Sequence, residues 1–211
     1  MKNWMEMSLE EYQNALASSA PTPGGGTAAA IALGHACALT QMVCKLTLGN
    51  ESWKEGWGFS EVADETAKIV SLRAKELAQL DSESFEKVMS CFKLPKTTDV
   101  EKSHRRNMIR SATLHAAEIP FETAILGMDL LNVLENLGKF GNANAASDVG
   151  VASLLASAAV KGALFNVEIN TNSIPTEMGN HISEKIPSLR IECSQASRLV
   201  MHAVHDRIST N

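Results

Sequence analysis

Hydrophobic residues recur at three- and four-residue steps over most of the chain. The clearest case is the stretch from Ser60 to Phe92, and this spacing is the period of a helix, not that of a strand. Two other stretches, Thr27–Thr47 and residues 149–167, are apolar and crowded with small side chains. Small side chains let a neighbouring backbone come close, so these stretches suit central packed helices or a subunit contact.

Capping residues and prolines predict where these helices begin and end. Ser8-Leu9-Glu10-Glu11 is a capping box that opens a short helix ending near Ser18. We expect Ser60 to cap the third helix and Asp99 to cap the fourth, which Pro120 breaks or kinks. A fifth helix follows, with Gly138 as its C-terminal cap.

The remaining third of the chain gives similar signals. Ser147 or Asp148 is expected to cap a sixth helix. Ile174-Pro175 begins the last helical region, which Pro187 kinks or divides and which ends near Arg207. No segment alternates with a two-residue period, and composition is uniform from residue 1 to 211. We therefore predict one domain, an all-α bundle of about six to eight helices.

Composition narrows the function classes. The 211 residues are 45% hydrophobic, which excludes disorder as the main state, and a net charge of −5 argues against a nucleic-acid partner. The N-terminal residues lack the apolar core of a signal peptide, and polar residues interrupt the most apolar stretch, so we expect no membrane span. No CxxC pair occurs, which predicts buried reduced thiols in a cytoplasmic protein. The cysteines are Cys37, Cys44, Cys91 and Cys193.

The loop Pro21-Thr22-Pro23-Gly24-Gly25-Gly26 is the first candidate site. Three consecutive glycines leave backbone N–H groups uncovered before a helix, where they can hold an anion or let a planar ligand approach. The loop is not a Walker motif, because the Gly-Lys-Ser/Thr ending is missing. The alternative is a tight turn between two helices.

Asp81 is the second candidate. Aspartate is a poor helix former, and this one follows the apolar residue Leu80, so its side chain either points into a half-buried groove or is solvated. In a groove, the carboxylate would serve as a general base or stabilise a cation.

A basic run is the third candidate. It either binds the carboxylates of a substrate tail or forms an ordinary solvated helix face. Its members are Lys93, Lys96, Lys102, His104, Arg105, Arg106 and Arg110.

An amide-rich turn is the fourth candidate, formed by Asn142, Asn144, Ser147 and Asp148. Asparagine amides both donate and accept hydrogen bonds, which suits a heterocycle, although turns and helix caps use the same residues. Asn166 and Asn170 raise the same question at the end of the sixth helix. His202 and His205 share a helix face but lack a third ligand, so we predict no metal site.

Taken together and in order, these motifs resemble the cyclodeaminase/cyclohydrolase family. The resemblance extends from about residue 8 to residue 207. It is carried by Ser18 to Ala30, Asp81-Ser82-Glu83-Ser84-Phe85, Leu94-Pro95-Lys96, Glu101-Lys102 with Arg105-Arg106, Gly141-Asn142-Ala143-Asn144, Ser147-Asp148, Gly162-Ala163, Asn166-Val167 and Ile169-Asn170. Thr27 stands where the family usually has Ser, and the loop Leu48 to Phe59 departs from the family's Lys/Tyr pattern.

The resemblance implies an all-α homodimer that binds a reduced, polyglutamylated folate as its substrate and holds no permanent cofactor. It implies that Asp81 is catalytic and that Pro23, Gly24, Gly25 and Gly26 line the folate site. Asn142, Asn144, Ser147 and Asp148 would lie near the pterin or the one-carbon unit. We expect Lys96, Lys102, Arg105 and Arg106 to receive the glutamate tail.

The expected reaction is hydrolysis of 5,10-methenyltetrahydrofolate to 10-formyltetrahydrofolate. Cyclodeamination of formiminotetrahydrofolate, which releases ammonia, is the alternative, because both reactions pass through a similar tetrahedral centre. The lack of a formiminotransferase domain in these 211 residues favours hydrolysis. A third hypothesis is a folate-binding or assembly module without catalysis, in which the small-residue helices serve only dimer packing.

Overall fold

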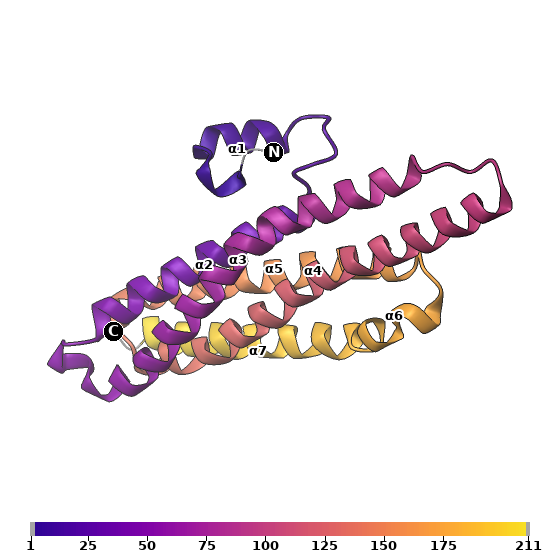
Figure 1. Ribbon diagram of the computed structural model, residues 1–211. Helices are drawn as coiled ribbons and strands as arrows, with labels where there is room; N and C mark the ends of the chain where they lie inside the picture. The colour runs from indigo at the N-terminus through magenta and orange to yellow at the C-terminus, as the bar shows by residue number, and fades with distance from the viewer. Residues whose placement is uncertain (1–2, 210–211) are drawn as a thin grey trace.

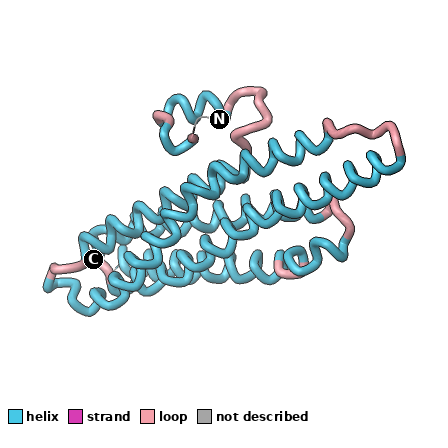
Figure 2. Tube along the Cα trace, viewed as in Figure 1, coloured by secondary structure: helices cyan, strands magenta, loops and turns pink. Residues whose placement is uncertain are grey.

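Long helices packed side by side make up the computed structural model, which describes residues 3–209 (Figure 1). No strand occurs among these residues, so the all-α prediction is confirmed (Figure 2). The elements are η1 (Trp4–Glu6), α1 (Leu9–Leu16), α2 (Gly25–Thr47), η2 (Glu51–Gly56), α3 (Trp57–Phe92), α4 (Asp99–Phe140), η3 (Ala143–Ala145), α5 (Ala146–Thr171), α6 (Thr176–Ser183) and α7 (Ile186–Ser209).

The core runs along the axis of an elongated bundle formed by α2, α3, α4, α5 and α7, while α1 lies on the outside (Figure 1). Each of these helices contributes apolar side chains to this core. In α3 they are mainly alanines, so the expectation that the large apolar residues at helical spacing form its buried face is wrong: Val62, Ile69 and Leu72 are exposed. Fully buried side chains from different helices meet there, among them Leu33, Val70, Leu134, Val160 and Val200. All four cysteines are free and buried, as predicted.

Pro120 neither breaks nor visibly divides α4, so the prediction of two helices on either side of it is wrong. Proline has no N–H, so the carbonyl oxygen of Ala116, four residues earlier, loses its helical donor. The Nδ2 of Asn170 in α5 donates to this oxygen at 2.8 Å. A neighbouring helix thus supplies the donor for this carbonyl, and α4 continues through Pro120 as one helix of 42 residues.

Several predicted boundaries need correction. Ser60 does not cap α3 but lies buried inside it, since the helix begins at Trp57. The N-cap of α4 is Thr98, not Asp99, because Thr98 and Glu101 form a reciprocal capping box. Gly138 is not a cap but a buried residue of α4.

The beginnings of α5 and α7 also differ from the prediction. Ala145 precedes α5 without a side-chain cap, so Ser147 and Asp148 lie in the first turn of the helix and cap nothing. Pro187 does not kink the last helix; it lies in the first turn of α7, where a missing N–H costs no helical bond. The last helical region is nevertheless divided, because α6 (Thr176–Ser183) is a separate helix that ends before α7 begins.

Two helices, α2 and the segment Ala143–Thr171, are long and apolar enough to cross a membrane by length and composition alone. Within the bundle, 50% and 56% of their apolar windows are buried. The core helix of a bundle passes the same test, and residues of both segments lie in the hydrophobic core. Their other halves face outward.

Candidate active site

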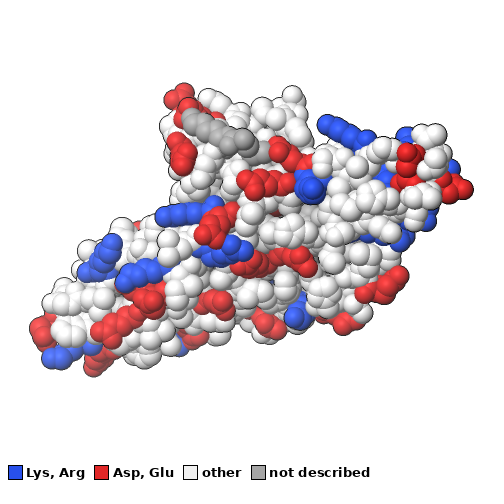
Figure 3. Space-filling view, viewed as in Figure 1, with Lys and Arg blue, Asp and Glu red and all other residues white. Residues whose placement is uncertain are grey.

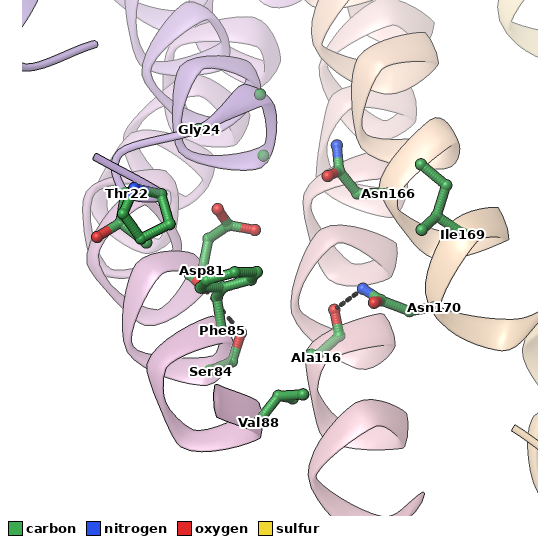
Figure 4. A pocket seen from close by; sticks show the side chains of 13 residues that line it. Thr22, Gly24, Asp81, Ser84, Phe85, Val88, Ala116, Asn166, Ile169 and Asn170 are labelled. Carbon is green, nitrogen blue, oxygen red and sulfur yellow. Dashed lines mark hydrogen bonds between the residues drawn. The ribbon is translucent and has the colours of Figure 1, made fainter. Parts of the chain in front are cut away.

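A cavity of about 310 Å³ lies where the N-terminus of α2 meets the middle of α3 and α4 and the C-terminal part of α5. Figure 4 shows the Asp81 carboxylate on one wall, with Asn166 and Asn170 on the wall opposite. The lining residues are Pro21, Thr22, Gly24, Gly25, Gly26, Asp81, Ser84, Phe85, Val88, Ala116, Asn166, Ile169 and Asn170. The structure thus brings Asp81 and the glycine loop together, although they are more than 50 residues apart in the sequence.

A chain of hydrogen bonds leads from Trp4 in η1 to Asp81. The Nε1 of Trp4 donates to the Oγ of Ser82 at 3.0 Å, and the Ser82 and Thr27 hydroxyls are 3.0 Å apart. Thr27 in turn donates to the Oδ2 of Asp81 at 3.0 Å. An indole N–H can only donate and a carboxylate can only accept, so the bonds align in one direction and favour an ionised Asp81.

Two opposing effects act on the pKa of Asp81. Burial raises the pKa of this carboxyl above its ordinary value, because an ionised group loses hydration in the pocket. The hydroxyl and backbone N–H of Thr27 oppose this rise by bonding to the ionised form. Burial dominates, so the pKa is raised, and a carboxylate of this kind is a better proton acceptor than a free aspartate.

Gly26 leaves the space that Asp81 occupies. A Cβ on Gly26 would lie 2.6 Å from the Cγ of Asp81, closer than two non-bonded carbon atoms approach. Gly25 is different, because a Cβ there would be 3.8 Å from the Nδ2 of Asn166, an ordinary contact. Among the predicted glycines, Gly26 is thus the one whose missing side chain allows the carboxylate to enter the pocket. Pro23, within the same loop, is buried but does not line the cavity, contrary to the expectation.

The opposite wall offers two carboxamides. The Nδ2 of Asn166 donates to the Gly162 carbonyl at 3.0 Å, and that of Asn170 to the Ala116 carbonyl. These bonds fix both side chains through their nitrogens. No hydrogen bond to either amide oxygen occurs within residues 3–209, so both oxygens are available as acceptors for a ligand.

Some lining residues were not predicted from the sequence. Ser84, Phe85 and Val88 follow Asp81 at steps of three, four and seven residues, which is one face of a helix. That spacing would have identified them once Asp81 was placed in the pocket.

The buried hydroxyl of Tyr12 in α1 was also not predicted. It has no hydrogen-bond partner within the described chain, and burial and the charge of Asp81 raise its pKa.

The basic residues lie beyond the cavity, at the tip where α3 and α4 join. Lys102 pairs with Asp99 at 3.0 Å, and Arg105 donates to the Phe92 carbonyl at 3.1 Å. Lys96 and Arg106 are exposed, without a hydrogen bond or ion pair to any of residues 3–209. Arg106 is ten residues from Ala116, which lines the cavity, and so is about 15 Å away along α4.

The amide-rich turn lies at the other end of the bundle. The Asn142 backbone N–H donates to the Thr47 hydroxyl at 3.0 Å, and its Nδ2 donates to the Leu46 carbonyl. Thr47 ends α2, and the cavity lies at the start of that 23-residue helix, about 33 Å away. Within one chain, Asn142, Asn144, Ser147 and Asp148 therefore do not meet Asp81, contrary to the expectation of a shared pocket.

Charged side chains do not gather into a patch of one sign on the face seen in Figure 3. On the face seen in Figure 3, basic and acidic side chains are interspersed along the bundle. Within residues 3–209 no group of three His, Cys, Asp or Glu side chains is placed to hold a metal ion.

Comparison with known proteins places these features in context. Residues 8–186 match the family model described as formiminotransferase-cyclodeaminase. A methenyltetrahydrofolate cyclohydrolase of Methylorubrum extorquens is 36% identical over 166 residues, 79% of this chain and 80% of that protein. A formimidoyltransferase-cyclodeaminase of Gallus gallus is 29% identical over 203 residues, 94% of this chain but 37% of that protein.

A solved structure also matches. The crystal structure of formiminotetrahydrofolate cyclodeaminase from Thermotoga maritima superposes with a TM-score of 0.85 and 28% sequence identity. The match covers 96% of this chain and 98% of that one. The likeness therefore includes the whole helical bundle and the elements that form the cavity.

Proposed function

The chain belongs to the formiminotransferase-cyclodeaminase family, and we propose that it hydrolyses 5,10-methenyltetrahydrofolate to 10-formyltetrahydrofolate. The observation that carries this proposal is the half-buried Asp81 carboxylate, with a raised pKa, facing a cavity walled by glycine backbone and carboxamides. The relative that is 36% identical bears the name of this activity.

The chemistry uses a carboxylate twice. The one-carbon bridge of the substrate is a cationic amidinium, which the negative charge of Asp81 attracts. Water attacks the bridging carbon, its oxygen forms a bond there, and Asp81 accepts the proton that the water loses. The tetrahedral intermediate then collapses: the hydroxyl oxygen forms the formyl C=O and loses its proton, the bond from carbon to N5 breaks, and N5 takes up one proton. The formyl group stays on N10, and the proton that Asp81 accepted is the one released in the overall reaction.

The cavity walls suit the rest of the substrate. The ring of Phe85 and the bare backbone of Gly24 and Gly25 are flat surfaces that fit a planar ring. The amide oxygens of Asn166 and Asn170 suit its N–H groups. Hydrolysis changes no oxidation state, so we propose that the folate is the substrate and that no resident cofactor takes part. Buried thiols suit a cytoplasmic enzyme.

Cyclodeamination is the second candidate, favoured by the structural match to a formiminotetrahydrofolate cyclodeaminase. In that reaction the anilino nitrogen of the folate attacks a formimino carbon and ammonia leaves, so the same cavity would serve. Purified protein should be assayed with each folate, following substrate consumption and ammonia release. Turnover of methenyltetrahydrofolate supports the proposal, whereas ammonia release alone supports the second candidate. Inactivity towards both folates would refute both reactions.

Thr27→Val is expected to move the acid limb of the pH profile of kcat/KM to higher pH. Valine keeps the shape of threonine but donates no hydrogen bond, so the ionised form of Asp81 loses a partner and its pKa rises further. Asp81 acts when deprotonated, hence activity at low pH falls more than activity at high pH. Thr27→Ser, which keeps the hydroxyl, is the control and should leave the profile in place. Unmoved profiles for both variants would contradict the role of this bond.

Replacing both Lys96 and Arg106 by Ala should raise KM about tenfold with little change in kcat. The glutamate tail of a folate is anionic, and we propose that these two free cations bind it, with a larger effect for polyglutamylated substrate. Arg198→Ala on α7 removes an exposed charge elsewhere and serves as the control. A loss in kcat with unchanged KM would contradict a tail-binding role.

A further inference from the structure

Pro120 is buried in the middle of α4, where a proline normally breaks or kinks a helix. It has no N–H, and its ring crowds the carbonyl of the residue four positions earlier, which is Ala116. Ala116 borders the cavity that holds Asp81. The proline therefore leaves, at the cavity wall, a backbone acceptor that needs a new donor.

The side chain of Asn170 supplies this donor from α5. Its Nδ2 lies 2.8 Å from the Ala116 oxygen (Figure 4). A carboxamide has one end that donates and one end that accepts, and the two ends are nearly equal in shape. A carbonyl oxygen only accepts, so it pairs with the NH2 end and repels the oxygen end. The chemistry of the partner thus sets the orientation of the amide and leaves the Oδ1 of Asn170 for a ligand in the cavity.

Asn166, the other carboxamide of this wall, is held differently. Its Nδ2 donates at 3.0 Å to the carbonyl of Gly162, four residues earlier in the same helix. That carbonyl keeps its regular helical donor, because α5 contains no proline. The bond of Asn166 is therefore local to α5, whereas the bond of Asn170 joins α5 to α4 and depends on the proline.

The side chains of Asp81, Asn166 and Asn170 all offer oxygen atoms to the cavity. Ser84 donates its hydroxyl proton to the Asp81 backbone carbonyl at 2.8 Å, so its oxygen is also left as an acceptor. Such walls favour a ligand edge that presents N–H groups over one that presents lone pairs, because two facing acceptors repel and stay unpaired. Turning the Asn170 amide over would exchange an acceptor for a donor and reverse this preference at one position.

We propose that Pro120 is a positioning residue. By freeing the Ala116 carbonyl, it fixes the Asn170 amide with its oxygen towards the cavity, where that oxygen accepts a hydrogen bond from an N–H group of the ligand. Pro120→Ala would return the backbone N–H, the carbonyl would regain its helical donor, and the Asn170 amide would be free to turn. That the ligand is a reduced folate rests on the proposed function, but the coupling between Pro120 and Asn170 does not.

Thermal unfolding of single and double variants tests this coupling without an assay of activity. Asn170→Ala should lower the melting temperature by roughly 3 °C, the effect of about one net hydrogen bond in a chain of this size. In the Pro120→Ala background it should lower the melting temperature much less, because the Ala116 carbonyl has its helical donor there. Pro120→Val, which keeps more of the buried volume, is a second background and should give the same result.

Asn166→Ala is the matched control for the unfolding experiment. Its bond lies within α5, so its effect on the melting temperature should be the same with and without the proline. An equal effect of Asn170→Ala in all backgrounds would overturn the coupling between Pro120 and Asn170.

Kinetics and folate binding test the role of the fixed oxygen. Pro120→Ala should raise the KM for methenyltetrahydrofolate and the dissociation constant of tetrahydrofolate about fivefold, while kcat changes less than twofold, since one hydrogen bond of uniform binding is lost. It should have no further effect once Asn170 has been replaced by Ala. Pro187→Ala, in the first turn of α7, is the control and should match the wild type, because no helical bond is missing there.

Two results would overturn the positioning role: a wild-type KM for Pro120→Ala, or an equal rise of KM in the Asn170→Ala background. If the wild-type protein neither binds tetrahydrofolate nor turns over either folate, the proposed function fails, and the role of the oxygen in folate binding fails with it. The unfolding experiment still decides whether Pro120 positions Asn170.

Discussion

Asp81→Asn is expected to lower kcat by about 10²–10⁴-fold while leaving the fold intact. General-base catalysis contributes a factor of this size, which corresponds to about 3–5 kcal/mol of the activation barrier. Asparagine has the same shape and still accepts the hydrogen bond from Thr27, but it neither accepts a proton from water nor attracts a cation. Steady-state kinetics with methenyltetrahydrofolate measure the loss.

Glu83→Gln is the matched control, because Glu83 is an exposed carboxylate two residues away on the same helix and bonds only to Gln79 among the described residues. Its rate should stay within about twofold of the wild type, as is usual for surface changes away from a site. Equal losses in both variants would indicate a general charge effect. An unchanged rate for Asp81→Asn would remove Asp81 from the mechanism.

Asp81→Asn should also stabilise the protein at neutral pH. Burial raises the pKa of Asp81 in the folded state, so between the unfolded and folded pKa values the native state binds more protons than the unfolded state. The free energy of unfolding therefore falls as pH rises through this window, and the wild type carries that cost at neutral pH. Asparagine has no charge to desolvate, so thermal unfolding should occur at a higher temperature. A lower melting temperature would contradict the burial of the charge.

Local sequence signals predicted which segments are helical but not where each helix begins and ends. Helical spacing predicted that Ser60 to Phe92 is a helix, but it did not locate the buried face of α3. Ile69 and Leu72, which belong to the expected stripe, are 58% and 66% exposed, because small residues such as Ala67 face the core instead. The effect of Pro120 was not predictable, because it depends on Asn170, a residue 50 positions away that supplies the missing donor. The N-cap of α4 was assigned to the wrong residue, because Thr98 and Asp99 are both good capping residues. Only the backbone conformation distinguishes them.

The site was predictable only in part, because sequence order does not show which end of a helix faces which motif. Asp81 next to Leu80 was expected at the edge of an apolar stripe, and it does lie in the cavity beside the glycine loop. Asn142 looked equally suited to a ligand, yet its amide holds the turn to the end of α2. Its distance from Asp81 follows from the contact of the turn with Thr47 at the C-terminal end of α2, a long-range contact that no local motif encodes.

Gly26→Ala is expected to lower kcat/KM by about 10²-fold. A methyl group on Gly26 overlaps the Asp81 carboxylate, and the backbone at the start of α2 is held by the helix, so the carboxylate must move. A displacement of about 1 Å of a catalytic group costs on the order of 10²-fold in rate. Gly34→Ala in the same helix is the control, because a Cβ there meets nothing within 4 Å, and alanine should stabilise the helix by about 1 kcal/mol.

A double variant shows whether Gly26 acts through Asp81. If the alanine methyl lowers activity only by displacing the carboxylate, Gly26→Ala should cost little more once Asp81 has been replaced by Asn, and the two losses will not add. Losses that multiply would instead mean that the glycine contacts the substrate directly, as a bare backbone against a planar ring. Either result depends on kcat/KM measured for the two single variants and the double variant in the same assay, with circular dichroism confirming that all three are folded.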